Sequence, residues 1–196
     1  MLDWLLYLLH ALFWGCFALA RSLTRRRAPA PTPGPATSGP ERVAPWSRSL
    51  LLVHTAAFGV MYFGMGNTII PGRVADMFPG QRLLGTLVIG VGGAFAAAAM
   101  LHFTSWRYRA ALAEGHQLAT GGPFALVRHP IYLALDLLAL GTALWTPTPF
   151  TWAGFVLMVI GSELRGRAEE RLLLEGFGEA YRSYAARTRR FLPGIY

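Results

Sequence analysis

Long apolar runs alternate with short polar segments along most of this chain. The runs cover about residues 2–20, 50–70 and 83–103, followed by two shorter ones at 131–145 and 150–162. A helix that crosses a hydrocarbon layer of roughly 30 Å needs about 20 apolar residues, which each of the first three runs supplies. The last two are short for a full crossing and predict a tilted or partly buried hairpin. The pattern predicts an all-α, polytopic membrane protein with about five transmembrane helices and a C-terminal cytosolic helix.

Composition supports a membrane protein with a single domain. Of its 196 residues 54% are hydrophobic and 14% are charged, and the mean hydropathy is +0.38. Soluble domains are less apolar than this. We divide the chain into a first span (1–22), a flexible cytosolic linker (23–48), spans two and three (49–103), and a C-terminal section (104–196). The linker assignment rests on its many Pro, Gly and Ala residues and on the absence of a periodic apolar pattern.

The distribution of arginine predicts the orientation. The net charge of +8 arises without any lysine, and the arginines cluster between the apolar runs: six in 21–48, three in 104–128 and seven in 163–190. An excess of positive charge marks cytoplasmic loops. We therefore expect a multi-pass protein of the cytoplasmic (inner) membrane, with its N-terminus outside and its C-terminus in the cytosol. Membrane orientation accounts for these charges, so we expect no nucleic-acid partner.

Metal and disulfide chemistry are not expected. The single cysteine, Cys16, lies inside an apolar run and has no second thiol to pair with. The five histidines are scattered, and none stands at metal-ligand spacing from another. His10, His54, Asn67 and His102 are interpreted as interhelical hydrogen-bonding groups or interface anchors. Asp136 lies in the fourth apolar run, where a carboxylate is costly unless it is paired or hydrated. It is either the partner of an arginine or a residue of a substrate path.

Two polar blocks flank the predicted hairpin. The first, Arg128-His129-Pro130-Ile131-Tyr132, precedes it, and the second, Arg165-Gly-Arg-Ala-Glu169-Glu170, follows it. Pro130 keeps His129 out of helical geometry, so irregular backbone is expected at the membrane surface. The blocks suit either interfacial anchors with a solvated, salt-bridged helix face, or a pocket of low dielectric that holds a zwitterionic or cationic ligand.

The same blocks resemble a known family. The segment Thr120-Gly-Gly-Pro-Phe124-Ala-Leu-Val-Arg-His-Pro-Ile-Tyr132 is similar to a signature of the isoprenylcysteine carboxyl methyltransferases. Their relatives include membrane phospholipid N-methyltransferases and bacterial thiol S-methyltransferases. Arg165-x-x-x-Glu169-Glu170, then Phe177-Gly178-x-x-Tyr181-x-x-Tyr184 and Phe191-Leu-Pro193, follow the C-terminal signature in order and spacing. The resemblance covers about residues 115–195, and Phe124 stands where tyrosine is usual.

The resemblance implies an enzyme that uses S-adenosylmethionine. It implies that these residues line the cofactor pocket: His116, Gln117, Leu118, Val127, Arg128, His129, Tyr132, Glu170 and, in the C-terminal signature, Tyr181. It places Arg165 and Glu169 near the reacting centre, where Arg165 would position an anionic acceptor and Glu169 would orient it or take a proton from an amine.

The methyl acceptor is left open by the sequence. An isoprenylcysteine-type carboxylate is most like the family, and a phospholipid amine or a small thiol are alternatives. Membrane lipids are expected partners, and nothing in the sequence indicates the oligomeric state. A competing interpretation from another class is a non-enzymatic membrane subunit that docks a cytosolic partner through its arginine-rich segments.

Overall fold

The computed structural model describes residues 4–27, 42–43, 47–69, 76–102, 111–112 and 118–195. The regular secondary structure of these residues is helical except for one short pair of strands. The elements are α1 (Leu5–Arg27), β1 (Arg42–Val43), α2 (Ser47–Ile69), α3 (Gln81–His102), β2 (Ala111–Leu112), α4 (Pro123–Leu126), α5 (Pro130–Trp145), α6 (Pro149–Phe177) and α7 (Glu179–Arg187).

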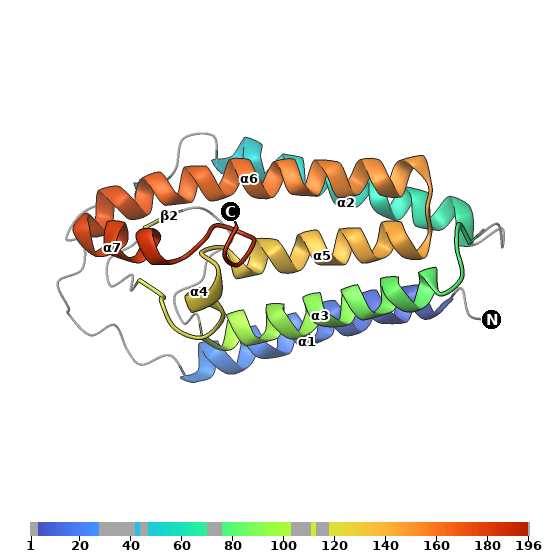
Figure 1. Ribbon diagram of the computed structural model, residues 1–196, viewed down its shortest axis with the longest axis horizontal. Helices are drawn as coiled ribbons and strands as arrows, with labels where there is room; N and C mark the ends of the chain where they lie inside the picture. The colour runs from blue at the N-terminus through green and yellow to red at the C-terminus, as the bar shows by residue number, and fades with distance from the viewer. Residues whose placement is uncertain are drawn as a thin grey trace.

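The long helices lie side by side and alternate in direction (Figure 1). As a result, the C-terminal ends of α1, α3 and α6 and the N-terminal ends of α2 and α5 share one end of the bundle, where α4 and α7 also lie. We call this end the α7 end. The candidate functional site lies at this end.

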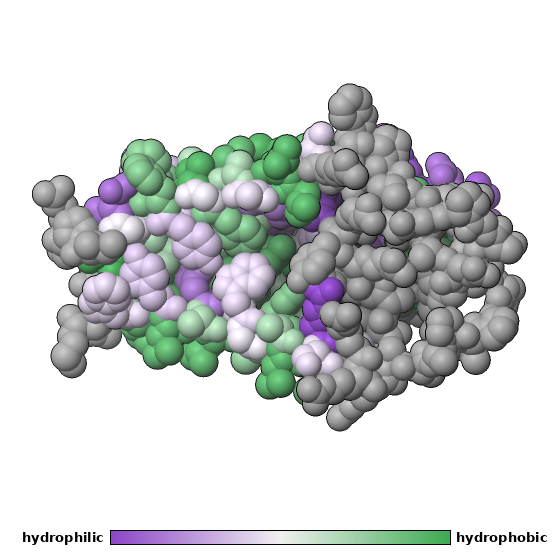
Figure 2. Space-filling view, turned by 180° about the vertical axis from the view of Figure 1, so that it is seen from behind, coloured by the Kyte–Doolittle hydropathy of each residue, from purple (hydrophilic) through white to green (hydrophobic). Residues whose placement is uncertain are grey.

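Three of the described helices are long and apolar enough to cross a membrane: Leu5–Thr24, Ser49–Ile69 and Gln81–His102. The helix Pro130–Trp145 is apolar but shorter. Large apolar side chains such as Leu52, Leu83 and Val91 are more than half exposed, and green apolar residues line the upper and lower edges of the coloured part of Figure 2. In water so much exposed apolar surface would be a liability, whereas lipid solvates it. The protein is therefore an all-helical membrane protein, as predicted; about five crossings stays a prediction.

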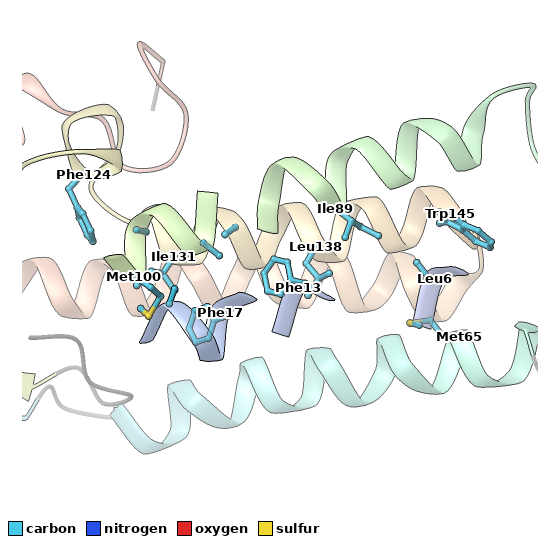
Figure 3. Close-up of a cluster of buried hydrophobic side chains, with 14 of the residues drawn as sticks. Leu6, Phe13, Phe17, Met65, Ile89, Met100, Phe124, Ile131, Leu138 and Trp145 are labelled. Carbon is cyan, nitrogen blue, oxygen red and sulfur yellow. The ribbon is translucent and has the colours of Figure 1, made fainter. Parts of the chain in front are cut away.

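Close helix contacts in the bundle depend on small residues. The helix α3 packs along α5, and an added Cβ on Gly141 would lie 2.7 Å from the carbonyl oxygen of Gly85. An added Cβ on Gly92 would lie 3.1 Å from the carbonyl oxygen of Ala134. Such approach of two backbones replaces the hydrophobic driving force that helices lack in lipid. The buried side chains of α1, α3 and α5, among them Phe13, Ile89 and Leu138, fill the space between these helices (Figure 3).

Both ends of the predicted linker differ from the structure. Helix α1 continues to Arg27, beyond the predicted end of the first span at residue 22, so residues 23–27 are helix and not linker. The hydroxyl of Thr24 donates to the carbonyl oxygens of Ala20 and Met100, which joins this turn to α3. Within the same predicted linker, β1 pairs antiparallel with β2. At the end of the predicted linker, residues 47 and 48 already belong to α2. The other linker residues, 28–41 and 44–46, lie outside the described residues.

The second arm of the predicted hairpin is much longer than its apolar run. Helix α6 has 29 residues and continues without a break from the apolar segment through the Arg165–Glu170 block to Phe177. At 1.5 Å per residue it is about 43 Å long, more than the roughly 30 Å of hydrocarbon. Thr148 and Thr151 form a capping box at its start, and Gly178, with φ of +53°, ends it before α7. The polar block therefore lies on the same rigid helix as the apolar arm.

Candidate functional site

The first polar block begins α5 and is held by the C-terminal segment. His129 is the N-cap of α5 and Pro130 its first residue, where a missing N–H costs nothing. Just before the helix, the backbone N–H of Arg128 donates to the carbonyl oxygen of Arg189 at 2.7 Å, and that of His129 donates to Arg190 at 3.2 Å. These bonds fix the segment around residue 189 directly beside the start of α5.

The turn before this block is fixed just as tightly. Gly122 has φ of +58°, and an added Cβ would lie 2.5 Å from the His102 ring, so only glycine fits. The Tyr184 hydroxyl on α7 donates to the carbonyl oxygen of Phe124 at 2.6 Å. The Phe124 ring itself is buried in the apolar core beside α3. Phenylalanine therefore suits this position, where tyrosine is usual in the signature that the segment resembles, because the ring lies among apolar side chains.

Glu170 is the centre of the ionised network at the α7 end. Its carboxylate accepts hydrogen bonds from Arg128 Nε at 2.8 Å and from Arg190 Nη2 at 2.7 Å, and His129 Nε2 lies 3.2 Å away. Burial alone would raise the pKa of this carboxyl, but the hydrogen bonds from His129, Arg190 and Arg128 hold it well below its ordinary value. Glu170 is therefore ionised and fully partnered in this structure.

Glu169 faces the other side of the same histidine. It accepts a hydrogen bond from the Tyr132 hydroxyl, and its oxygens lie 3.7 Å from His129 Nδ1 and 3.9 Å from Arg165 Nη2. Burial opposes ionisation of Glu169, yet the contacts with His129 and Arg165 lower its pKa. Burial likewise disfavours charged His129, but the two carboxylates prevail and raise its pKa.

These side chains form two facing stripes. On α5 the stripe is His129, Tyr132 and Asp136; on α6 it is Ser162, Arg165 and Glu169. Each follows the three- and four-residue spacing of one helix face. The guanidinium carbon of Arg165 lies 5.1 Å from the centre of the Tyr132 ring, and the His129 ring stacks on the same tyrosine at 5.6 Å. At Gly166 a Cβ would lie only 3.3 Å from the His129 ring, so this glycine lets the two stripes meet.

The stripes continue toward the apolar part of the bundle. The Ser162 hydroxyl donates to Asp136 Oδ1 at 2.7 Å, and His54 Nε2 on α2 lies 3.4 Å from the same hydroxyl. The His54 ring is 5.8 Å from the Tyr132 ring. Among the described residues the hydrogen-bond partner of Asp136 is thus a serine, and they include no arginine partner, which was one of its two predicted roles. His54 bridges helices, as predicted, but does so beside the site.

Of the predicted site residues, the structure brings six into contact: Arg128, His129, Tyr132, Arg165, Glu169 and Glu170. Val127 is fully buried and pairs with Arg189 through its backbone. Tyr181 is buried on α7, and its hydroxyl has no hydrogen-bond partner among the described residues. Leu118 is half-buried. His116 and Gln117 lie outside the described residues.

Sequence reasoning missed Arg190. Its guanidinium bridges Glu170 and Glu163, with Nη1 at 2.8 Å from the Glu163 carboxylate. A signal was present, because Arg190 directly precedes the Phe191-Leu-Pro193 element of the C-terminal signature. The alternative of a solvated salt-bridged face does not describe Arg165, which is only 8% exposed. It does describe Arg167, which is 59% exposed and pairs with Glu163 on the same helix.

Fold and site together define an integral membrane protein with a largely buried, ionised cluster at one end of its helix bundle. The family model of the phospholipid methyltransferases matches residues 81–180, from the start of α3 into α7. This is about half of the chain and includes both polar blocks. No curated protein matches the chain. The chain belongs to the phospholipid methyltransferase family, which makes it a membrane methyltransferase in the general sense.

Proposed function

We propose that this protein transfers a methyl group from S-adenosylmethionine to an acceptor that reaches the α7 end from the bilayer. The observation that carries the proposal is the joining of two polar blocks, 42 residues apart at Arg128 and Glu170, into one network around His129. Interfacial anchors would point to water separately. Here they converge, with Arg165 and Tyr132 buried between them.

The residues at this end suit such a cofactor. A buried hydroxyl without a partner costs about 1–3 kcal/mol, and the Tyr181 hydroxyl is one. The charges of Glu170 and Arg128 both act on it. A zwitterionic ligand with hydroxyl groups would complete this set, with Tyr181, Arg128, His129 and Glu170 around it. Val127, Tyr132 and the connection at residues 116–118 are the other residues that we propose for its pocket.

When bound, the cofactor would supply a methyl group on a positively charged sulfur. The acceptor's lone pair would bond to the methyl carbon in line as the sulfur leaves with the electrons of the broken carbon–sulfur bond. The protein's contribution is to hold the acceptor and exclude water. We propose that Arg165, already placed over the Tyr132 ring, orients the acceptor. Glu169, ionised and within reach of Tyr132 and His129, would receive the proton of an amine or orient an anionic acceptor.

For the acceptor, the family favours a phospholipid amine over the isoprenylcysteine-type carboxylate that the sequence motifs suggested first. A small thiol is the third candidate. We propose that the site faces the cytosol from the inner membrane, with the N-terminus outside, because residues 21–27 at the end of α1 and the arginine-rich segment 163–190 both belong to the α7 end.

The direct test is calorimetric titration of the detergent-solubilised protein with S-adenosylhomocysteine. Saturable binding is expected. Tyr181→Phe removes one unpartnered hydroxyl, so it should keep the thermal midpoint while weakening binding about tenfold, and Glu170→Gln should abolish binding. The control Asn67→Ala changes an exposed residue of α2 far from the α7 end and should bind as the wild type does.

No binding to folded wild-type protein would refute the proposal and leave the non-catalytic subunit as the better interpretation. Equal affinities of the Tyr181→Phe and Asn67→Ala variants would show that the cofactor lies elsewhere.

A further inference from the structure

Asp136 is a carboxylate in the apolar part of α5 whose surroundings in the structure do not balance it. It lies six residues after Pro130, about 9 Å along the helix from its start. Ionisable residues at such positions are costly to bury and mark functional sites unless a partner neutralises them. It accepts one hydrogen bond, from Ser162, and among the described residues no arginine pairs with it.

The position of Asp136 relates it to the proposed site. It follows Tyr132 by one helical turn on α5, and its partner Ser162 precedes Arg165 by one turn on α6. His54 on α2 lies beside both of these helical turns. Its Nε2 lies 3.4 Å from Ser162 Oγ, and the centre of its ring lies 5.8 Å from that of the Tyr132 ring. A continuous polar stripe thus leads from Glu169 into the hydrocarbon region.

The carboxylate also has room for further hydrogen bonds. Ser162 and His54 are buried, whereas Asp136 as a residue is only partly buried. An ionised carboxylate has room for about four hydrogen bonds, and Ser162 uses one. The arrangement offers an unused acceptor, one turn on the apolar side of the reacting centre.

We propose that Asp136, held by the Ser162 hydroxyl, binds the protonated amine of a membrane lipid before that amine passes its proton to Glu169, and so selects an amine acceptor. This inference rests on the proposed function. A lipid ammonium would give Asp136 the positive partner that it lacks among the described residues, and its N–H groups match the carboxylate positions that Ser162 leaves open. A carboxylate acceptor would meet a like charge here, which disfavours it.

The structural alternative is a neutral carboxylic acid that only ties α5 to α6 through Ser162. Polar side chains commonly join helices in this way. The two interpretations differ in ligand selectivity, because a neutral acid has no preference for a cation over an uncharged group with the same tail.

The experiment compares two probes, radiolabelled dodecylamine and dodecanol, which share a tail and differ in charge. Binding to the detergent-solubilised full chain is measured by equilibrium dialysis. We expect the wild type to bind the amine at least tenfold more tightly than the alcohol, and Asp136→Asn, which keeps the shape, to bind both alike. Methyl transfer into phosphatidylethanolamine vesicles should show at least a tenfold rise in KM for the same variant.

The matched control is Tyr62→Phe. Tyr62 belongs to a second intramembrane polar cluster, in which His10 and Trp14 both contact its hydroxyl at 3.0 Å, and His10 also contacts Thr142 on α5. Loss of that hydroxyl should leave the amine preference unchanged. Affinity for S-adenosylhomocysteine reports folding of every variant.

Wild-type protein without an amine preference overturns the inference, whatever the variants do. So does an Asp136→Asn variant that retains the preference, or a wild type that methylates a carboxylate or thiol but no amine. Failure of S-adenosylhomocysteine to bind the wild type is a separate result, which refutes the proposed function instead.

Discussion

Neutralising Glu170 tests the ionised network most directly. The substitution Glu170→Gln keeps the size of the side chain and removes its charge. In the structure two guanidinium groups depend on that charge: Arg128 through Nε at 2.8 Å, and Arg190 through Nε at 3.0 Å and Nη2 at 2.7 Å. Their side chains are 14% and 17% exposed, and that of Glu170 is 15% exposed. Water therefore cannot readily replace the lost carboxylate.

The expected loss follows from this burial. Removing one partner of a buried ion pair costs about 3–5 kcal/mol. Glutamine still accepts a hydrogen bond, and Arg128 keeps its bonds to the carbonyl oxygens of Ala185 and Thr188, so we expect about 3 kcal/mol. In a chain of this size each kcal/mol shifts the thermal midpoint by about 2–4 °C, which predicts a fall of roughly 6–12 °C.

Thermal unfolding in detergent, followed by circular dichroism, measures the shift. The control is Glu179→Gln, the same chemical change at a side chain that is 78% exposed and pairs with the exposed Arg182. Surface pairs contribute little, so its midpoint should change by less than about 2 °C. Equal thermal midpoints of the two variants would refute the prediction. They would show that Glu170 does not hold the C-terminal segment to the start of α5.

The pH dependence of stability should depend on His129, because its pKa is raised in the folded protein. The charged form then stabilises the fold fully below about pH 6.5. This contribution is lost as the pH rises through the raised pKa. The midpoint should therefore fall on the alkaline side, and His129→Gln should flatten that slope; an unchanged slope contradicts the assignment. Gly166→Ala would push a methyl group to 3.3 Å from the His129 ring and should weaken S-adenosylhomocysteine binding severalfold, whereas Gly59→Ala, with no atom within 4 Å of its Cβ, should not; calorimetry of the two variants decides. Gly141→Ala would place its Cβ 2.6 Å from Ile89 Cγ1 and should lower the thermal midpoint by the equivalent of about 1–3 kcal/mol while binding is retained; a neutral result would mean that α3 and α5 separate easily.

The sequence alone predicts several features of the fold. The three long spans appear where the apolar runs predict them, because the transfer of a helical segment into lipid depends on its own side chains. The restriction that Pro130 imposes on His129 likewise predicted irregular backbone where α5 begins. The boundary at Glu163 was misjudged as the end of a hairpin arm, since a change from apolar to charged residues says nothing about whether a helix stops. Helix α6 continues because helical hydrogen bonds are indifferent to that change.

Part of the site was also visible in the motifs. Their order and spacing pointed to Arg128, His129, Tyr132, Arg165 and the glutamate pair, and the structure joins these side chains. The roles that the motifs suggest for them remain proposals. What the motifs did not show is that Glu170 is already partnered by arginines from both sides, so that it joins the start of α5 to the C-terminal segment.

The chain's local chemistry was enough to predict that it is a membrane protein, that three helices are long and apolar enough to span, and which polar residues are costly to place there. Which groups meet was decided only by the packing of the helices. Arg190 reaches Glu170 because the C-terminal segment returns to the start of α5, and Asp136 meets Ser162 because α5 and α6 align their faces. Hydropathy is a property of each segment alone, whereas an ion pair or a binding site depends on distances between segments far apart in sequence.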